Sequence, residues 1–337
     1  MNVVAFRRSC MLAIVAAALT PYRSFAAGKQ TPKPAPAPAA AAQGVETWPI
    51  REHVYLLVSG GANMTVQIGE HAVVVVNAGP AEMSTQVLGA IKKLTDLPIE
   101  YIIDTNGDPD VVGGNAAISK SGYMNTGQPG EPPGAGIVSQ INTLDRLTLL
   151  NAQNRARNRS ITPIGLPTDP YEDQWAFFNG EAVMLYHAPQ AHTDGDTYVF
   201  FRRSDVIATG DIFNTDRYPA IDTEHGGSLA GILDALADII AMMVPRQNEE
   251  GGTYLVPGRG RICDRTEIVN YHDALSIIQG RIRYYVSKGM TLEQVREARP
   301  SFDYDGVYGS DQGPWSTRLF IDAVYREESR LKNGGTK

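Results

Sequence analysis

Residues 104–115 read DTNGDPDVVGGN and form the most informative segment of the chain. They follow an apolar run at 100–103 that predicts a strand, so the segment is expected to be a loop at a strand end. Acidic and amide residues recur at alternate positions, as in calcium-binding loops. However, Pro109 and Asn115 stand where an EF-hand loop has glycine and glutamate, so an EF-hand is not predicted.

Short apolar strands and amphipathic helices alternate on both sides of this loop. Strands are predicted at 53–58, 64–68, 72–76, 100–103, 183–187, 197–201, 206–208 and 253–256. Helices are predicted from Pro80, within 135–152, from Ser228, from the Asp264–Glu267 capping box to Gly289, and at 291–299 and 315–331. The run VVVV at 73–76 is typical of a strand covered on both faces. The pattern favours stacked sheets with helices outside, and it also fits one Rossmann-like sheet.

The 104–115 loop resembles the signature loop of the metallo-β-lactamase superfamily, T-H-x-H-x-D-H-x-G-G-N. Thr105, Asp110 and the Gly113–Asn115 segment match that pattern in register. Histidines of the pattern are replaced at three positions, Asn106, Asp108 and Val111. The loop thus keeps its frame while losing imidazoles.

Four further blocks resemble the same family and occur in the family's order. They are NAG at 77–79, AHTDGDT at 191–197, TGD at 209–211 and PGRG at 257–260. The segment from Tyr218 to the C-terminal helices resembles an exported branch with a helical tail. The resemblance covers about residues 45–330 and implies an α/β (α+β) fold. This fold would be an αββα sandwich at 45–262 with a helical extension at 263–337 packed on it.

The resemblance implies a degenerate dinuclear zinc site. The first metal position maps to Asn106, Asp108 and His192, and the second to Asp110, Val111 and Arg259, with Asp211 between them. Valine offers no donor atom, and arginine stays protonated. We expect Arg259 to pair with Asp110 and Asp211 in place of the second metal.

The surviving donor groups form a weak metal set: Asp108, Asp110, His192 and Asp211. They would hold no metal or one divalent ion, zinc by resemblance or Ca²⁺ or Mg²⁺ by their oxygen-rich chemistry. Asp110 is the catalytic candidate if the site is active. Asn115 and His225 are candidates to line the pocket, and His225 could also replace a lost ligand or cap a helix.

The N-terminus predicts export. Arg7 and Arg8 precede an apolar run at 11–20, and Ser24 and Ala26 offer a cleavage site, so residues 1–26 are predicted to be a signal peptide. The run is too short for stable membrane insertion. Residues 27–44 are expected to be a Pro/Ala-rich linker, and the protein periplasmic or secreted, whether by the Sec or the twin-arginine route.

Composition limits the partners. The formal net charge of −7 argues against a nucleic-acid partner. Cys263 is the single cysteine after the signal peptide, so it is expected to be a buried apolar residue without a disulfide.

Three functions remain open, and the loss of metal ligands favours the first, an impaired or ligand-binding pseudoenzyme, over the second. The first is a ligand-binding pseudoenzyme with a small-molecule ligand, and the second is a hydrolase of ester, lactam or thioester bonds that uses one metal. The third is an exported interaction module with a protein partner.

Overall fold

The computed structural model describes residues 44–123, 134–157, 165–248 and 251–334. The predicted signal peptide and residues 27–43 of the predicted linker lie outside this range. These described residues belong to one compact unit. No helix in the described ranges is long and apolar enough to cross a membrane.

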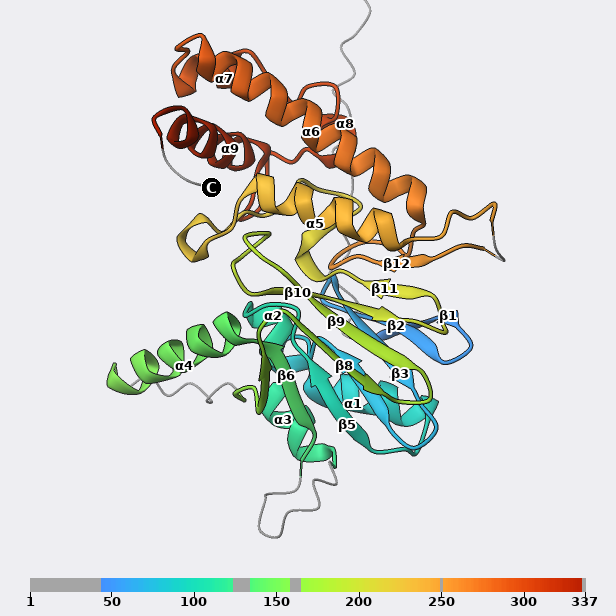
Figure 1. The fold of residues 1–337 in the computed structure, drawn as a ribbon. Coiled ribbons are helices and arrows are strands. Elements are labelled where there is room, and N and C mark those ends of the chain that lie inside the picture. The colour runs from blue at the N-terminus through green and yellow to red at the C-terminus, as the bar shows by residue number, and fades with distance from the viewer. Residues whose placement is uncertain (1–43, 124–133, 158–164, 249–250, 335–337) are drawn as a thin grey trace, which may run out of the picture. The chain divides into compact units, whose positions relative to one another are not determined.

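Two β-sheets stack face to face in the described part of the chain (Figure 1). The first has the order β1-β2-β3-β4-β5-β6-β7, antiparallel from β1 to β4 and parallel from there on. Its strands are β1 (Glu46–Arg51), β2 (Val54–Ser59), β3 (Ala62–Ile68), β4 (Val73–Val76), β5 (Ile99–Ile103), β6 (Gly136–Gln140) and β7 (Asp169–Tyr171).

The second sheet has the order β12-β11-β10-β9-β8. Its strands are β8 (Gln174–Phe178), β9 (Ala182–Ala188), β10 (Asp196–Phe201), β11 (Val206–Ala208) and β12 (Tyr254–Val256). The pairs are antiparallel except β11 with β12, which are parallel. The two separate sheets exclude the Rossmann-like alternative and confirm the αββα prediction.

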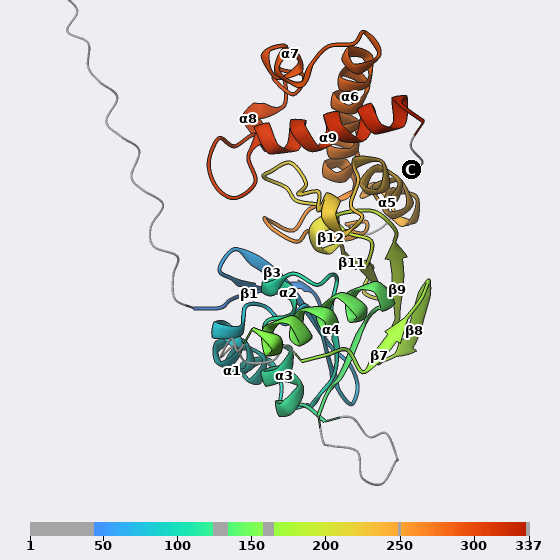
Figure 2. The same cartoon turned by 90° about the vertical axis from the view of Figure 1, so that its left-hand side faces the viewer.

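Helices cover the outer faces of both sheets (Figures 1 and 2). On the first sheet lie α1 (Ser84–Leu94) and α3 (Asn115–Ser121), and on the second lies α5 (Leu229–Met242). Beyond α5, α6 (Arg265–Ser287) packs on α5, and α9 (Thr317–Lys332) packs on α6 and contacts α7 (Leu292–Glu297). The short elements are α2 (Pro109–Val112), α8 (Asp305–Tyr308), η1 (Ala81–Met83), η2 (Gly210–Ile212) and η3 (Thr223–His225), and α4 (Ile141–Ala156) follows β6.

The alternation of side chains along β4 explains its four consecutive valines. Val74 and Val76 point into the core between the sheets, while Val73 and Val75 pack against the outer helices. All four are buried because each face of a strand in this sandwich has a cover. The same alternation sends Val199 of β10 inward and Tyr198 outward.

The predicted helix within 135–152 is wrong at its start. Residues 136–140 form β6, which pairs in parallel with β5, and the helix α4 begins only at Ile141. The five residues of β6 are all buried between layers, a tertiary effect that periodicity does not report. Gln140 marks the boundary, because its side chain accepts a hydrogen bond from the backbone N–H of Asn142.

The last helix closes the start of α5. Both carboxylate oxygens of Glu327 in α9 accept backbone N–H groups, from Leu229 at 2.7 Å and from Ala230 at 3.1 Å. These are donors that a helix leaves unsatisfied at its N-terminus, and a carboxylate there also complements the helix dipole. These hydrogen bonds connect the C-terminal helix α9 to α5, the helix that covers the second sheet.

We expect Glu327→Ala to lower the free energy of unfolding by about 1–3 kcal/mol, because two buried N–H groups lose their acceptor. Urea denaturation followed by circular dichroism measures this change. Arg326→Ala, at an exposed position on the same helix, is the matched control. An equal and small effect of both substitutions would contradict the capping role.

Candidate functional site

The loop at 104–115 is fixed to the end of β4 by Asn77. The Asn77 side-chain oxygen accepts hydrogen bonds from the backbone N–H of Thr105 at 3.1 Å and from its hydroxyl at 2.9 Å. Asn77 has a φ of 67°, a left-handed conformation that asparagine tolerates better than most residues. The strand end therefore sets where the loop's side chains begin.

Two glycines allow the neighbouring turns to meet the loop. Gly210 has a φ of +53°, and a Cβ there would lie 2.4 Å from the hydroxyl oxygen of Thr105. A Cβ on Gly258 would lie 2.7 Å from the carbonyl oxygen of Gly210 and 2.9 Å from a carboxylate oxygen of Asp211. Only glycine fits these close approaches, which bring Asp211 and Arg259 to the loop.

Three metal-ligating side chains converge at this point. Asp108, His192 and Asp211 each offer a donor atom, and the three atoms lie within 4.8 Å of one another. The Nδ1 atom of His192 lies 2.9 Å from the carbonyl oxygen of Ala220, while Nε2 lies 3.2 Å from the Asp108 carboxylate. Since Nδ1 must donate to the carbonyl, Nε2 is the nitrogen that faces the carboxylates.

The remaining residue of the predicted first metal position is turned differently. The Asn106 side-chain oxygen accepts the backbone N–H of Asp108 at 2.9 Å, and its NH₂ group donates to Asp211 at 2.9 Å. Asn106 therefore presents hydrogen atoms, not a donor lone pair, to the centre of the cluster. It orients Asp211 without adding a ligand.

Charge coupling within the cluster shifts the pKa values in opposite directions. Burial lowers the pKa of His192, but the hydrogen bond with Asp108 and the negative charges of Asp196 and Asp211 raise it well above its ordinary value. Burial raises the pKa of Asp108, but the hydrogen bond with His192 and nearby positive charges outweigh it, so this pKa is lowered. Without a cation, the pair is thus an imidazolium and a carboxylate.

The predicted second metal position contains an ion pair. An Arg259 amino group contacts a carboxylate oxygen of Asp110, and both side chains are partly buried. Burial and the Asp211 charge raise the pKa of Asp110, against the lowering effect of Arg259. The contact to Asp110 matches the expectation, whereas Asp211 instead accepts from Asn106.

Val111 lies where a histidine of the pattern would stand. It is 4% exposed and belongs to a small apolar cluster with Val112 and Leu147, against which Leu166 packs. At this position the side chain therefore contributes apolar packing and no group that could bind a metal.

The two pocket candidates are placed differently. His225 lines a cavity of about 540 Å³ that also includes Asp108, and its Nδ1 lies 2.5 Å from the Asp222 carboxylate. Asn115 is fully buried, lines no cavity described for the structure and donates to Asp104 at 2.7 Å. The hydrogen bond to Asp104 connects Asn115 to the start of the 104–115 loop, and its place in a pocket stays a prediction.

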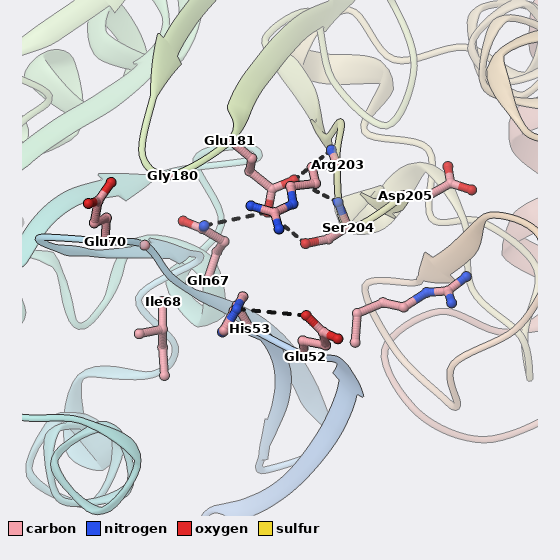
Figure 3. Close-up of a pocket in the computed structure, with 12 residues that line it drawn as sticks. Glu52, His53, Gln67, Ile68, Glu70, Gly180, Glu181, Arg203, Ser204 and Asp205 are labelled. Carbon is pink, nitrogen blue, oxygen red and sulfur yellow. Dashed lines mark hydrogen bonds and ion pairs between the residues drawn. The ribbon is translucent and has the colours of Figure 1, made fainter.

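A second cavity, of about 590 Å³, lies at the turns β1–β2, β3–β4, β8–β9 and β10–β11 and shares no residue with the cluster (Figure 3). Glu181 in its wall is 5% exposed, yet its carboxylate already accepts from the backbone of Arg203 and Ser204 and from the Ser204 hydroxyl. Its role is to fix the β10–β11 turn, so the Glu181 carboxylate is already satisfied within the protein.

Sequence reasoning missed the acidic residue that holds the His192 turn. Asp196 is 1% exposed, and its carboxylate accepts from both the backbone N–H and the hydroxyl of Thr193. Burial raises its pKa to about 7. The AHTDGDT block contained this residue, but only the structure shows that it faces inward. Cys263 is buried as expected, and burial raises the pKa of its thiol.

We expect Asp104→Asn to flatten the pH dependence of stability. Burial raises the pKa of Asp104 to about 8. Between about pH 4, the unfolded value, and pH 8 the folded protein holds one more proton, so its stability falls as pH rises, by at most ~1.4 kcal/mol per pH unit. The variant lacks this contribution. Urea denaturation of both proteins from pH 5 to 8 measures the difference, and parallel curves would refute it.

Comparison with solved structures identifies the fold. The chain superimposes on a metallo-beta-lactamase from Pontibacter korlensis with a TM-score of 0.51 and 16% identity, over 69% of this chain and 99% of that one. The DIM-1 metallo-beta-lactamase gives a TM-score of 0.49 and 11% identity, over 69% and 97%. No protein-family model and no curated protein sequence matches the chain. The protein has the metallo-β-lactamase fold.

Proposed function

We propose that the protein binds one divalent metal ion through Asp108, His192 and Asp211 and acts as a hydrolase with that single ion. The observation that carries the proposal is the convergence of three donor atoms within 4.8 Å of one another. Three protein ligands with a remaining open position are the usual arrangement of a catalytic metal site.

The chemistry of the donor set fits a cation. One imidazole and two carboxylates suit zinc, iron or manganese, and the set is less selective for zinc than three imidazoles. The hydrogen bond from His192 to the carbonyl of Ala220 orients the ring with Nε2 toward the carboxylates, as a supporting contact does in metal sites. Asn106 orients Asp211 in the same manner.

The remaining residues would serve the reaction electrostatically. When bound, a divalent ion would polarise a carbonyl group and lower the pKa of water, which supplies hydroxide at neutral pH to attack an ester, lactam or thioester. Arg259 keeps a fixed positive charge beside the cluster, which would stabilise negative charge that develops at the reacting group during hydrolysis. Asp110 neutralises part of that charge, so in this proposal it is a positioning residue. This replaces our sequence-based expectation of Asp110 as ligand and catalytic group.

A ligand-binding pseudoenzyme is the second candidate, favoured by a specific observation. The carboxylates of Asp108 and Asp211 accept hydrogen bonds from His192 and Asn106, so the atoms that could bind a metal already have partners within the protein. A protein selected only for ligand binding could keep this arrangement.

Export to the periplasm or the exterior and a role as an interaction module remain proposals. They are supported by the sequence of residues 1–44 alone.

Metal content separates the two main candidates. We expect the mature protein, purified and then dialysed against zinc or manganese, to retain about one equivalent of ion per chain. His192→Ala should lose it, because the single imidazole is removed. His187→Ala is the matched control, since that ring forms a hydrogen bond with the Asp194 backbone carbonyl and does not belong to the Asp108–His192–Asp211 cluster. Metal-free wild-type protein after this treatment would support the pseudoenzyme.

The Arg259–Asp110 pair predicts a gain of metal on substitution. We expect Arg259→His to raise the retained metal toward two equivalents, because it removes a fixed positive charge and adds an imidazole next to Asp110 and Asp211. Elemental analysis checks the stoichiometry. Arg261→His, two residues along and exposed, is the control. An unchanged metal content in Arg259→His would show that the ion pair does not occupy a metal position.

A further inference from the structure

The cavity beside the donor cluster has walls of two kinds. It measures about 540 Å³, and Asp108 belongs to both the cavity and the cluster. One wall comes from α4 and the other from the segment around η3. Its lining includes Asp108, Asp145, Arg146, Leu149, Asp194 and Glu224.

The charges of this cavity are unbalanced. Its lining includes five carboxylates, of Asp108, Asp145, Asp194, Asp222 and Glu224, and one guanidinium, of Arg146. Asp194 is paired with Arg146 at 2.5 Å, Asp222 with His225 and Asp108 with His192. Among the residues that the structure describes, Asp145 and Glu224 have no ion-pair partner recorded. The cavity therefore has negative charge available to a ligand.

The same cavity has an apolar wall that the fold does not use. The α4 sequence Leu147-Thr148-Leu149-Leu150 buries Leu147 completely but leaves Leu149 63% exposed and Leu150 37% exposed. Both exposed leucines line the cavity. Two exposed leucines next to carboxylates suit a ligand that offers an apolar part and a positive charge together.

We propose that this cavity selects substrates that carry a positively charged amine on an apolar chain, with the hydrolysable group directed toward Asp108 and His192. The cationic group contacts Asp145 and Glu224, and the apolar chain contacts Leu149. The proposal rests on the proposed hydrolase for the direction of the ligand, but not for its binding.

Binding without turnover tests the selectivity. Isothermal titration calorimetry would compare hexyltrimethylammonium, hexanoate and tetramethylammonium on the full mature protein, once after chelator treatment and once with zinc. We expect hexyltrimethylammonium to bind in both states, and the other two at least about tenfold more weakly, because each lacks the charge or the chain. Binding of hexanoate as tight as hexyltrimethylammonium, or no measurable binding of the latter, would overturn the proposal.

Substitutions locate the site. The double variant Asp145→Asn/Glu224→Gln should weaken hexyltrimethylammonium binding about fivefold and reduce its salt dependence. Leu149→Ser should weaken it about tenfold. Glu46→Gln and Leu319→Ser, at exposed positions outside the cavity, are the matched controls. Equal effects of cavity and control variants would refute the site.

The outcomes also separate the two proposals. Selective binding by a protein that retains no metal would refute the hydrolase and leave the cationic pocket standing. A stoichiometric metal without selective binding would do the reverse.

Discussion

The proposed site depends on one hydrogen bond, from Nδ1 of His192 to the carbonyl oxygen of Ala220. This bond decides which ring nitrogen faces Asp108 and Asp211, and a rotated ring would leave two carboxylates without an imidazole between them. The carbonyl is itself fixed by a short loop, because the backbone N–H of Asp222 donates to the His192 carbonyl at 2.9 Å. The imidazole and the loop thus hold each other.

Val111 and Arg259, at the predicted second metal position, make different kinds of contact. Val111 exchanges a polar group for apolar packing, which restores the local core but leaves no charge. Arg259 supplies positive charge to Asp110, so the carboxylate stays compensated. The loop is thus held by the apolar packing of Val111 and by the ion pair of Arg259 with Asp110. Gly210 and Gly258 are needed whether or not a metal is bound, because they allow the close approach of backbone turns.

Much of the fold followed from local patterns. The VVVV strand, the Ser228 cap and the Asp264–Glu267 capping box all depend on neighbours in sequence, and the structure has them as expected. The strand β6 did not, because its burial comes from partners distant in the chain. In the site, motif spacing brought together Asp108, His192 and Asp211. It did not show that Asn115 faces inward or that the leucines of α4 reach the cavity, since both depend on helix orientation.

The hydrogen bonds between Glu327 and the start of α5 connect the C-terminal helices to the segment that lines the 540 Å³ cavity. The segment just before α5 carries Asp222 and His225 of the cavity, and Ser228 joins it to the backbone at Gln190 and Ala191, next to His192. Through these hydrogen bonds, α9 supports the segment that forms one wall of the cavity. Removal of α9 would therefore leave two N–H groups at the start of α5 without their acceptor, directly after the segment that lines the cavity.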